Sequence, residues 1–258
     1  MTTVDKHPAG SVGWFDLMTT DPEAARAFYG AFFGWTFDVG PVELGHYTMC
    51  KLGGRNAGGL GSAPPGVTMP PVWSVYFITE DLDNTLMRLR ELVGNVVTPT
   101  MDIMEEGRMA VASDPTGAVF GIWQGKRHQG AQVIDEPGAM TWCEVNTRDG
   151  GKAAEFYAKV FDLEVKKLDA PGMEYKTLHK GDKTVGGVLQ MDQHWPESVP
   201  PHWMVYFAVA STDASCARVG ELGGKVCVPA FDTPYGRIAV LEDPQGAVFS
   251  IVQPPAKP

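Results

Sequence analysis

Residues 14–35 read WFDLMTTDPEAARAFYGAFFGW, and this stretch decides the fold. The first residues alternate as a strand does, and Thr20-Asp21-Pro22-Glu23 follows as a helix start. Either Asp21 caps the helix with Pro22 at its first position, or Thr20 and Glu23 form a capping box. The next residues place an apolar face at helical spacing: Ala25, Phe28 and Phe32. The stretch therefore predicts a strand and then a helix that packs against it.

The same plan returns in the second half of the chain. Trp14 corresponds to Trp142, 128 residues later, and Pro70 corresponds to Pro200, 130 residues later. A nearly constant offset indicates an internal duplication. The matched segments, in order along the first half, are Trp14-Phe15-Asp16-Leu17, Ala24–Tyr29, Ala57-Gly58-Gly59-Leu60, Pro70–Phe77, Gly107-Arg108 and Asp114-Pro115-Thr116-Gly117-Ala118-Val119-Phe120.

Each half contains two β-α-β-β-β modules. Strands are expected at 13–18, 35–39, 45–52, 55–60 and 72–78, a helix at 81–92, and three further strands end at 118–123. The Met-rich stretch Met101–Met109 is expected to be a loop over one cup. The order predicts an α+β fold in which four modules pair into two domains with curved mixed sheets and open cups. We expect domains at 1–125 and 138–258, joined by a linker at 126–137 that Gly and Pro residues bound.

Composition excludes several classes of function. A formal net charge of -10 is unfavourable for nucleic-acid binding. No apolar run is long enough to span a membrane, and residues 1–11 lack the features of a signal peptide. The four cysteines, Cys50, Cys143, Cys216 and Cys227, form no CxxC pair. We therefore expect a cytoplasmic protein with reduced thiols that binds neither nucleic acid nor membrane.

The entry segment Trp14–Tyr29 with Phe33-Gly34-Trp35, and the turns Asp114-Pro115-Thr116-Gly117 and Asp243-Pro244-Gln245-Gly246, resemble the vicinal oxygen chelate superfamily. This superfamily includes glyoxalase I, bleomycin-resistance proteins and extradiol dioxygenases. Within it, the chain resembles two-domain actinobacterial glyoxalase-like proteins, some of which belong to gene clusters for aromatic polyketides such as anthracyclines. The resemblance implies the two-cup fold, whereas function must be argued from the site.

The resemblance also implies a divalent metal held by His and Glu ligands. This chain departs from that pattern, since an indole offers only a hydrogen-bond donor and glycine offers no side chain. A catalytic metal needs about three protein ligands. We therefore expect no metal and no other cofactor. The superfamily's ligand positions fall at Trp14, Trp142, Ser74, Met204, Gly121, Ser250, Gly58-Gly59 and Gly186-Gly187.

Strand alternation predicts aromatic cups with a few polar groups. If Trp14 faces its cup, so does Asp16, and Trp142 and Glu144 do the same in the second half. Arg108, Ala110 and Ala112 are expected to share the inner face of a later strand, as is Arg237. The predicted substrate-binding residues are Trp14, Asp16, Tyr47, Tyr76, Arg108, Trp123, Trp142, Glu144, Tyr175, His202, Tyr206 and Arg237.

The alternative interpretation is that these residues have only a structural role. Trp14 and Trp142 would then fill disused cups, and Asp16 would pair with Arg108, as Glu144 would with Arg237, because burying unpaired charge is costly. His202 is either a general acid or base or a hydrogen-bonded neighbour.

The resulting hypothesis is a metal-independent protein that binds a planar, hydrophobic or aromatic small molecule, such as an antibiotic or polyketide-type metabolite. Resistance, sequestration or an accessory role in secondary metabolism would follow. The alternative is an enzyme, a glyoxalase-like lyase or isomerase or an oxygenase (hydroxylase) acting on a small carbonyl or aromatic substrate. A third hypothesis is a housekeeping dimer in which the second domain mainly supports the first. Edge strands of such sheets commonly pair, so a homodimer is expected as a partner.

Overall fold

The computed structural model describes residues 3–63, 69–170 and 172–255, and the two halves repeat one order of elements. The elements of the first half are β1 (Val12–Thr19), α1 (Pro22–Phe33), β2 (Thr36–Val39), the 3₁₀ turn η1 (Val42–Leu44), β3 (Thr48–Leu52), β4 (Arg55–Ser62), β5 (Val72–Ile78), α2 (Leu82–Glu91), β6 (Asn95–Ile103), β7 (Gly107–Ser113) and β8 (Val119–Gly125). Those of the second half are β9 (Met140–Thr147), α3 (Gly150–Phe161), β10 (Glu164–Ala170), β11 (Met173–Lys180), β12 (Lys183–Gln190), β13 (His202–Ala208), α4 (Thr212–Glu221), β14 (Lys225–Thr233), β15 (Gly236–Glu242) and β16 (Val248–Gln253).

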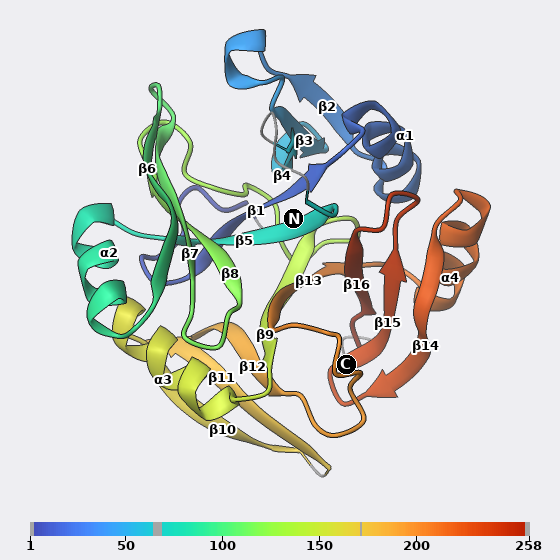
Figure 1. The fold of residues 1–258 in the computed structure, drawn as a ribbon. Helices are drawn as coiled ribbons and strands as arrows, with labels where there is room; N and C mark the ends of the chain where they lie inside the picture. Colours follow the sequence, from blue (N-terminus) through green and yellow to red (C-terminus); the bar gives the residue numbers. More distant parts are fainter. Residues whose placement is uncertain (1–2, 64–68, 171, 256–258) are drawn as a thin grey trace.

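Each half builds one eight-stranded mixed sheet (Figure 1). The first has the order β2-β3-β4-β1-β5-β8-β7-β6, and the second repeats it as β10-β11-β12-β9-β13-β16-β15-β14. Within each sheet the entry strand pairs in parallel with the last strand of its own module, as β1 does with β4, and antiparallel with the second entry strand, as β1 does with β5. The predicted α+β fold with two glyoxalase-like domains and open sheets is confirmed.

The start of α1 follows one of the two predicted arrangements. The side chain of Asp21 accepts hydrogen bonds from the backbone N–H groups of Glu23 and Ala24, and Pro22 is the first helical residue. Asp21 is therefore the N-cap, and no Thr20–Glu23 capping box is seen in this described segment. Asp149 is the N-cap of α3, where its side chain accepts a hydrogen bond from the backbone N–H of Lys152.

Two expected elements differ from the structure. The strand expected at 45–52 begins only at Thr48, because η1 precedes it and both Gly45 and His46 have positive φ. The Met-rich stretch expected to be a loop is mostly the β6–β7 hairpin: Met101 pairs with Met109, and only the turn around Met104 lies outside the strands. The stretch is therefore held as two paired strands by their main-chain hydrogen bonds, and it does not form the predicted loop.

The two halves pack through their helix-bearing faces. Helix α1 contacts α4, and α2 contacts α3, so each helix pair combines one helix from each half (Figure 1). On α1, Tyr29 is fully buried; it accepts a hydrogen bond from Trp73 Nε1 at 3.1 Å and donates one to Asp243 Oδ2 at 3.0 Å. Asp243 belongs to the Asp-Pro-x-Gly turn of the other half. The repeated helix and turn motifs therefore meet across the domain interface.

No helix in the described parts of the chain combines the length and the apolar character needed to cross a membrane. The described structure also contains four free thiols: Cys50 and Cys143 are buried, Cys216 is half-buried and Cys227 is exposed.

Tyr29→Phe is predicted to destabilise the fold by about 1–3 kcal/mol, because it leaves a buried carboxylate oxygen and an indole N–H without their partner. Urea unfolding measures this free energy. Tyr235→Phe is the matched control, since Tyr235 is 59% exposed, and its effect should stay below about 0.5 kcal/mol. Equal effects of the two substitutions would contradict the role assigned to Tyr29.

Candidate functional site

A hydrogen-bonded cluster lies on the face of the first sheet opposite α1. Trp14 and Asp16 come from β1, Tyr76 from β5, and Tyr47 immediately precedes β3. Tyr47 Oη and Tyr76 Oη both donate to Asp16 Oδ2, at 3.0 and 3.1 Å, and Trp14 Nε1 donates to Tyr47 Oη at 2.9 Å. Phe15, between them in sequence, faces the other way and packs on Trp73. Trp14, Asp16, Tyr47 and Tyr76 are called the first cluster below.

Asp16 is the central group of this cluster. It is 3% exposed, and its second oxygen, Oδ1, is buried with no hydrogen-bond partner among the described residues. Burial raises the pKa of the Asp16 carboxyl to about 6, and the hydrogen bonds from Tyr47 and Tyr76 oppose that rise only in part. The first cluster therefore holds a carboxyl group that is mostly neutral in mildly acidic solution.

The second sheet repeats the arrangement with glutamate in place of aspartate. Trp142 Nε1 donates to Tyr175 Oη at 2.9 Å, and Tyr175 Oη donates to Glu144 Oε2 at 2.6 Å. Tyr206 Oη donates to Glu144 Oε1, also at 2.6 Å. Burial raises the pKa of Glu144 as well. In this second cluster (Trp142, Glu144, Tyr175, Tyr206) each carboxyl oxygen has one tyrosine donor, unlike in the first.

The paired glycines of the repeat make room for these tyrosines. A Cβ on Gly59 would overlap the hydroxyl of Tyr47, and a Cβ on Gly187 would overlap that of Tyr175. The motif Ala57-Gly58-Gly59-Leu60 and its repeat thus let a tyrosine lie flat across the strand and reach the carboxyl group.

The superfamily's metal positions do not fit a metal here. Trp14 commits its only polar atom to Tyr47, and the space above Gly59 belongs to the Tyr47 ring. Ser74 and Gly121 complete the set and provide no carboxylate or imidazole. Across residues 3–63, 69–170 and 172–255, no three His, Cys, Asp or Glu side chains are grouped as metal ligands would be. The side chains at these positions can therefore make hydrogen bonds, but they do not form a set of metal ligands.

The linker adds a residue that sequence reasoning missed. His128 stands edge-on to the Trp14 ring, with ring centroids 4.2 Å apart, and its backbone oxygen accepts from Trp123 Nε1 at 2.8 Å. Burial lowers the pKa of His128 to about 4. Trp123, a predicted lining residue, therefore lies beside the first cluster with His128 between the two indoles. For His128, the only sequence signal was its position after Gly125 at the end of a predicted strand, and that signal favoured a linker.

His202 lies on the second sheet beside Asn146. Its Nδ1 is 2.9 Å from the Pro200 oxygen and its Nε2 is 3.2 Å from Asn146 Nδ2, a pattern that fits a neutral ring with Nδ1 as donor. Burial lowers its pKa accordingly. Asn146 Oδ1 and Ser250 Oγ are buried without a described partner on the same sheet.

The two arginines do not lie where the sequence predicted. Arg108 pairs with Asp83 in the first turn of α2, at 3.0 Å, and Arg237 pairs with Asp213 in the first turn of α4, also at 3.0 Å. Ala110 and Ala112 are likewise buried beneath α2. The prediction that these residues of β7 face the cup is therefore wrong, because the alternation along the strand was assigned one residue out of phase. A shift of one residue moves every side chain of a strand to the other face. The expected Asp16–Arg108 and Glu144–Arg237 pairs are therefore wrong.

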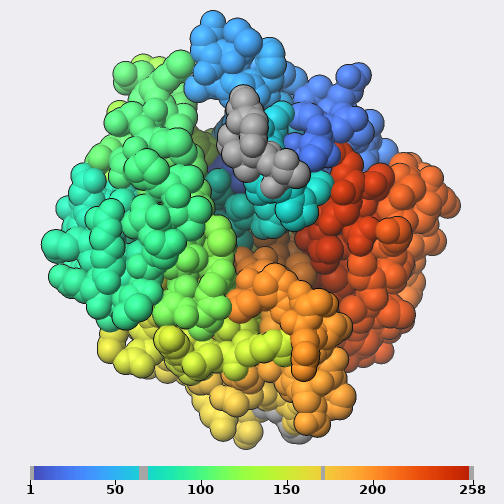
Figure 2. Space-filling view, viewed as in Figure 1, coloured from blue at the N-terminus to red at the C-terminus, as the bar shows by residue number. Residues whose placement is uncertain are grey.

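The first sheet curves into an open cup. Figure 2 shows the surface hollowed between the light-blue segment around η1 and the green β6. The segment around η1 follows the edge strand β2, and β6 is the other edge strand of the first sheet. We call the concave face that carries the first cluster the first cup, and its equivalent in the second sheet the second cup.

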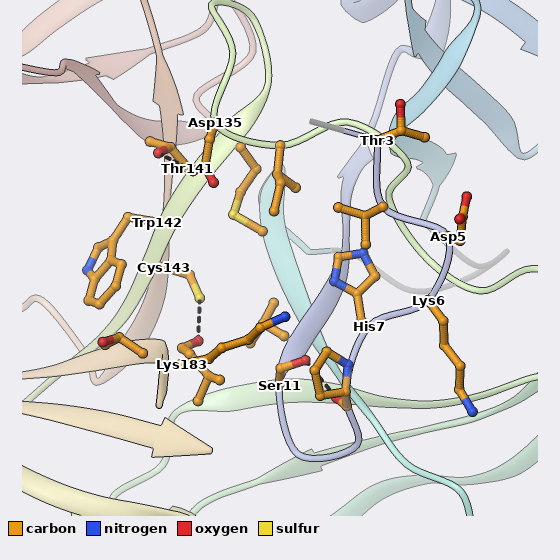
Figure 3. A pocket seen from close by; sticks show the side chains of 17 residues that line it. Thr3, Asp5, Lys6, His7, Ser11, Asp135, Thr141, Trp142, Cys143 and Lys183 are labelled. Carbon is orange, nitrogen blue, oxygen red and sulfur yellow. Dashed lines mark hydrogen bonds between the residues drawn. The ribbon is translucent and has the colours of Figure 1, made fainter. Parts of the chain in front are cut away.

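A separate pocket of about 550 Å³ lies between the N-terminal segment and the start of the second sheet (Figure 3). Trp142 and Cys143 line one side, and His7 and Ser11 the other. Most of its polar groups are already engaged: His7 with the Ala131 oxygen at 2.7 Å, and Ser11 with the Pro8 oxygen at 2.7 Å. The cups, which keep unpartnered buried polar atoms, are therefore the stronger candidates for recognition.

Comparison with known proteins agrees with this architecture. The sequence profile of the Glyoxalase/Bleomycin resistance protein/Dioxygenase superfamily matches residues 11–122 and again 127–251. "Putative glyoxylase CFP32" of Mycobacterium bovis is 40% identical over 251 residues, which is 95% of each chain. "Anthracycline biosynthesis protein DnrV" of Streptomyces peucetius is 36% identical, covering 95% of this chain and 93% of its own.

Among solved structures, the Mn(II)-bound glyoxalase of Novosphingobium aromaticivorans aligns with a TM-score of 0.65 at 14% identity, covering 95% of this chain and 82% of that one. The 2,2',3-trihydroxybiphenyl 1,2-dioxygenase of Sphingomonas wittichii aligns with a TM-score of 0.64, also at 14% identity, covering 95% and 91%. At this identity the likeness shows the fold alone.

Gly59→Ala is predicted to cost about 1–3 kcal/mol, because the new methyl group displaces Tyr47 from Asp16. Urea unfolding of the single variants and of the Gly59→Ala/Tyr47→Ala double variant gives the coupling energy, and the double variant should lose much less than the sum. Gly220→Ala is the control, since nothing lies within 4 Å of its new Cβ. Strict additivity would rule out the proposed fit between Gly59 and Tyr47.

Asp16 is also predicted to make stability pH-dependent. Its pKa is about 6 in the folded protein against an ordinary 3.8, so the folded state holds the proton more tightly. The stabilisation is thus complete below about pH 4 and is lost as the pH rises through about 6, by roughly 2–3 kcal/mol. The difference in unfolding free energy between the native chain and Asp16→Asn should change by this amount in that window. A constant difference would show that Asp16 titrates normally.

Proposed function

We propose that this chain, which belongs to the Glyoxalase/Bleomycin resistance protein/Dioxygenase superfamily, binds a planar hydrophobic or aromatic small molecule in its cups without a metal ion held by protein side chains. The observation that carries the proposal is the duplicated Trp–Tyr–carboxyl–Tyr cluster at the superfamily's metal position, with Asp16 Oδ1 left unpartnered in the first cup. A buried oxygen without a partner costs free energy, and a ligand hydrogen bond at Asp16 Oδ1 would offset that cost.

The composition of the cups supports this ligand class. Indole and phenol rings provide wide contact surfaces for a planar molecule, and their polar edges orient it. In the first cup, Ser74 is half-buried next to Asp16 on the neighbouring strand, and the ring of Tyr76 lies over Gly121. Small residues beside large rings make a surface that a flat ligand can lie on.

The relatives favour a role in secondary metabolism. DnrV is named as an anthracycline biosynthesis protein, and it resembles this chain over nearly its whole length. A binding protein with aromatic cups would sequester an aromatic polyketide-type metabolite or present it to other proteins. Resistance and accessory biosynthetic roles both follow from such binding.

A catalytic alternative is favoured by one observation. A buried carboxyl group with a pKa of about 6 and a free oxygen suits a general acid or base near neutral pH. Such an enzyme would act on a small carbonyl or aromatic substrate as a lyase or isomerase, and the name of CFP32 points the same way. Turnover of a bound carbonyl compound would distinguish catalysis from binding.

Calorimetric titration with 9-fluorenone, a planar aromatic probe, tests the binding proposal. We expect saturable binding that treatment with EDTA leaves unchanged. Ser74→Trp fills the first cup and His202→Trp the rim of the second, and each should weaken its own site by at least about tenfold, or about 1.4 kcal/mol. Asp182→Trp, in the exposed turn before β12, is the matched control. Undiminished binding in the Ser74→Trp/His202→Trp double variant, or a requirement for stoichiometric metal, would refute the proposal.

A further inference from the structure

We infer that the first cup selects ligands that present a carbonyl oxygen, to which the neutral carboxyl group of Asp16 donates a hydrogen bond from Oδ1. This inference rests on the proposed function and assigns the first cup a ligand chemistry that the second cup does not share.

The arrangement of donors around Asp16 shows which form of the carboxyl group the cluster holds. Tyr47 and Tyr76 both donate to Oδ2, and neither donates to Oδ1. A neutral carboxyl group has one strong acceptor, its carbonyl oxygen, and one hydroxyl oxygen that acts as donor. Two donors on one oxygen match that form, with Oδ2 as the carbonyl oxygen and Oδ1 as the hydroxyl.

The second cluster is an internal control for this interpretation. There Tyr175 and Tyr206 donate to different oxygens of Glu144, the distribution that suits a carboxylate whose charge is shared between two oxygens. Each Glu144 oxygen thereby accepts one phenol hydrogen bond, so neither is left without a partner as Asp16 Oδ1 is. The two clusters share one topology and differ in residue type only at Asp16 and Glu144, and their phenol donors are distributed differently over the carboxyl oxygens.

The surroundings of Asp16 contain no cation that would stabilise its charge. Within the described ranges no Lys, Arg or His pairs with it, and Arg108 lies on the far face of the sheet with Asp83. Its titratable neighbours are Tyr47 just before β3, Cys50 on β3, Tyr76 on β5, and His128 beside Trp14.

All four of these neighbours are neutral near pH 7. Burial raises the pKa values of Tyr47, Tyr76 and Cys50 well above their ordinary values and lowers that of His128 to about 4. A buried O–H without an acceptor is destabilising, and a ligand carbonyl removes that cost. Above about pH 6 the ionised form of Asp16 predominates and would accept from a ligand hydroxyl, so selection for a carbonyl ligand belongs to mildly acidic solution.

The test compares 9-fluorenone with 9-fluorenol, two planar compounds that differ in one oxygen function. The native chain should bind the ketone at least about tenfold more tightly at about pH 5 than at about pH 8, because ionised Asp16 has no proton to donate. The alcohol should change by less than about threefold. Calorimetry and tryptophan fluorescence quenching measure both affinities.

Two substitutions separate hydrogen bonding from packing. Asp16→Asn keeps the shape and offers an amide donor at every pH, so it should bind the ketone with no pH dependence and with near-native affinity at about pH 5. Asp16→Ala should bind it at least about tenfold more weakly. Asp182→Asn removes an exposed carboxylate of the β11–β12 turn and should behave like the native chain. Circular dichroism of each variant verifies the fold.

Failure of the inference about Asp16 and failure of the proposed binding function give different results. Equal, pH-independent binding of ketone and alcohol, or tighter binding of the alcohol, would overturn the assignment to Asp16 but leave small-molecule binding intact. A pH dependence that survives in Asp16→Asn would also overturn it. Binding of neither compound at either pH would overturn both the inference and the proposed function.

Discussion

The hydroxyl of Tyr29, held between Trp73 of its own half and Asp243 of the other, is the contact on which the arrangement of the two halves depends. It fastens α1 to both sheets, and Tyr157 repeats part of the pattern by accepting from Trp203 at 2.8 Å beside Asp114. The helix-bearing faces of both sheets are thereby buried in the domain interface. The opposite faces of both sheets stay uncovered by helices, and these are the faces that carry the two clusters.

The clusters show what hydrogen bonding can build where related folds use metal chemistry. A metal ion would fix and polarise a ligand oxygen through its charge. Here a buried carboxyl group and two phenols occupy the same face, and the glycines of β4 and β12 admit the phenol rings. Such a set can donate and accept hydrogen bonds and can hold one proton. Its strength comes from burial, because the same groups in water would compete with solvent.

Much of this could be predicted from the sequence, for reasons visible in single residues. Asp21 and Pro22 mark the helix start by local chemistry, and alternation along β1 places Trp14 and Asp16 on one face. The side of Arg108 could not be predicted, because a one-residue phase change reverses a strand's faces and the deciding partner, Asp83, is distant in sequence. The contact between the His128 and Trp14 rings could not be predicted either, because such ring contacts leave no periodic pattern in the sequence.

The difference between Asp16 and Glu144 shows how little change turns one duplicated site into two. A glutamate has one more methylene group, and Glu144 meets one phenol at each oxygen, whereas Asp16 meets both phenols at a single oxygen. The longer side chain has a phenol donor at each of its oxygens, and Asn146 and His202 lie in contact on the same sheet. The shorter one leaves an oxygen that only a ligand or solvent can satisfy. Duplication preserved the scaffold, and one methylene group changes how the two phenols meet the buried carboxyl group.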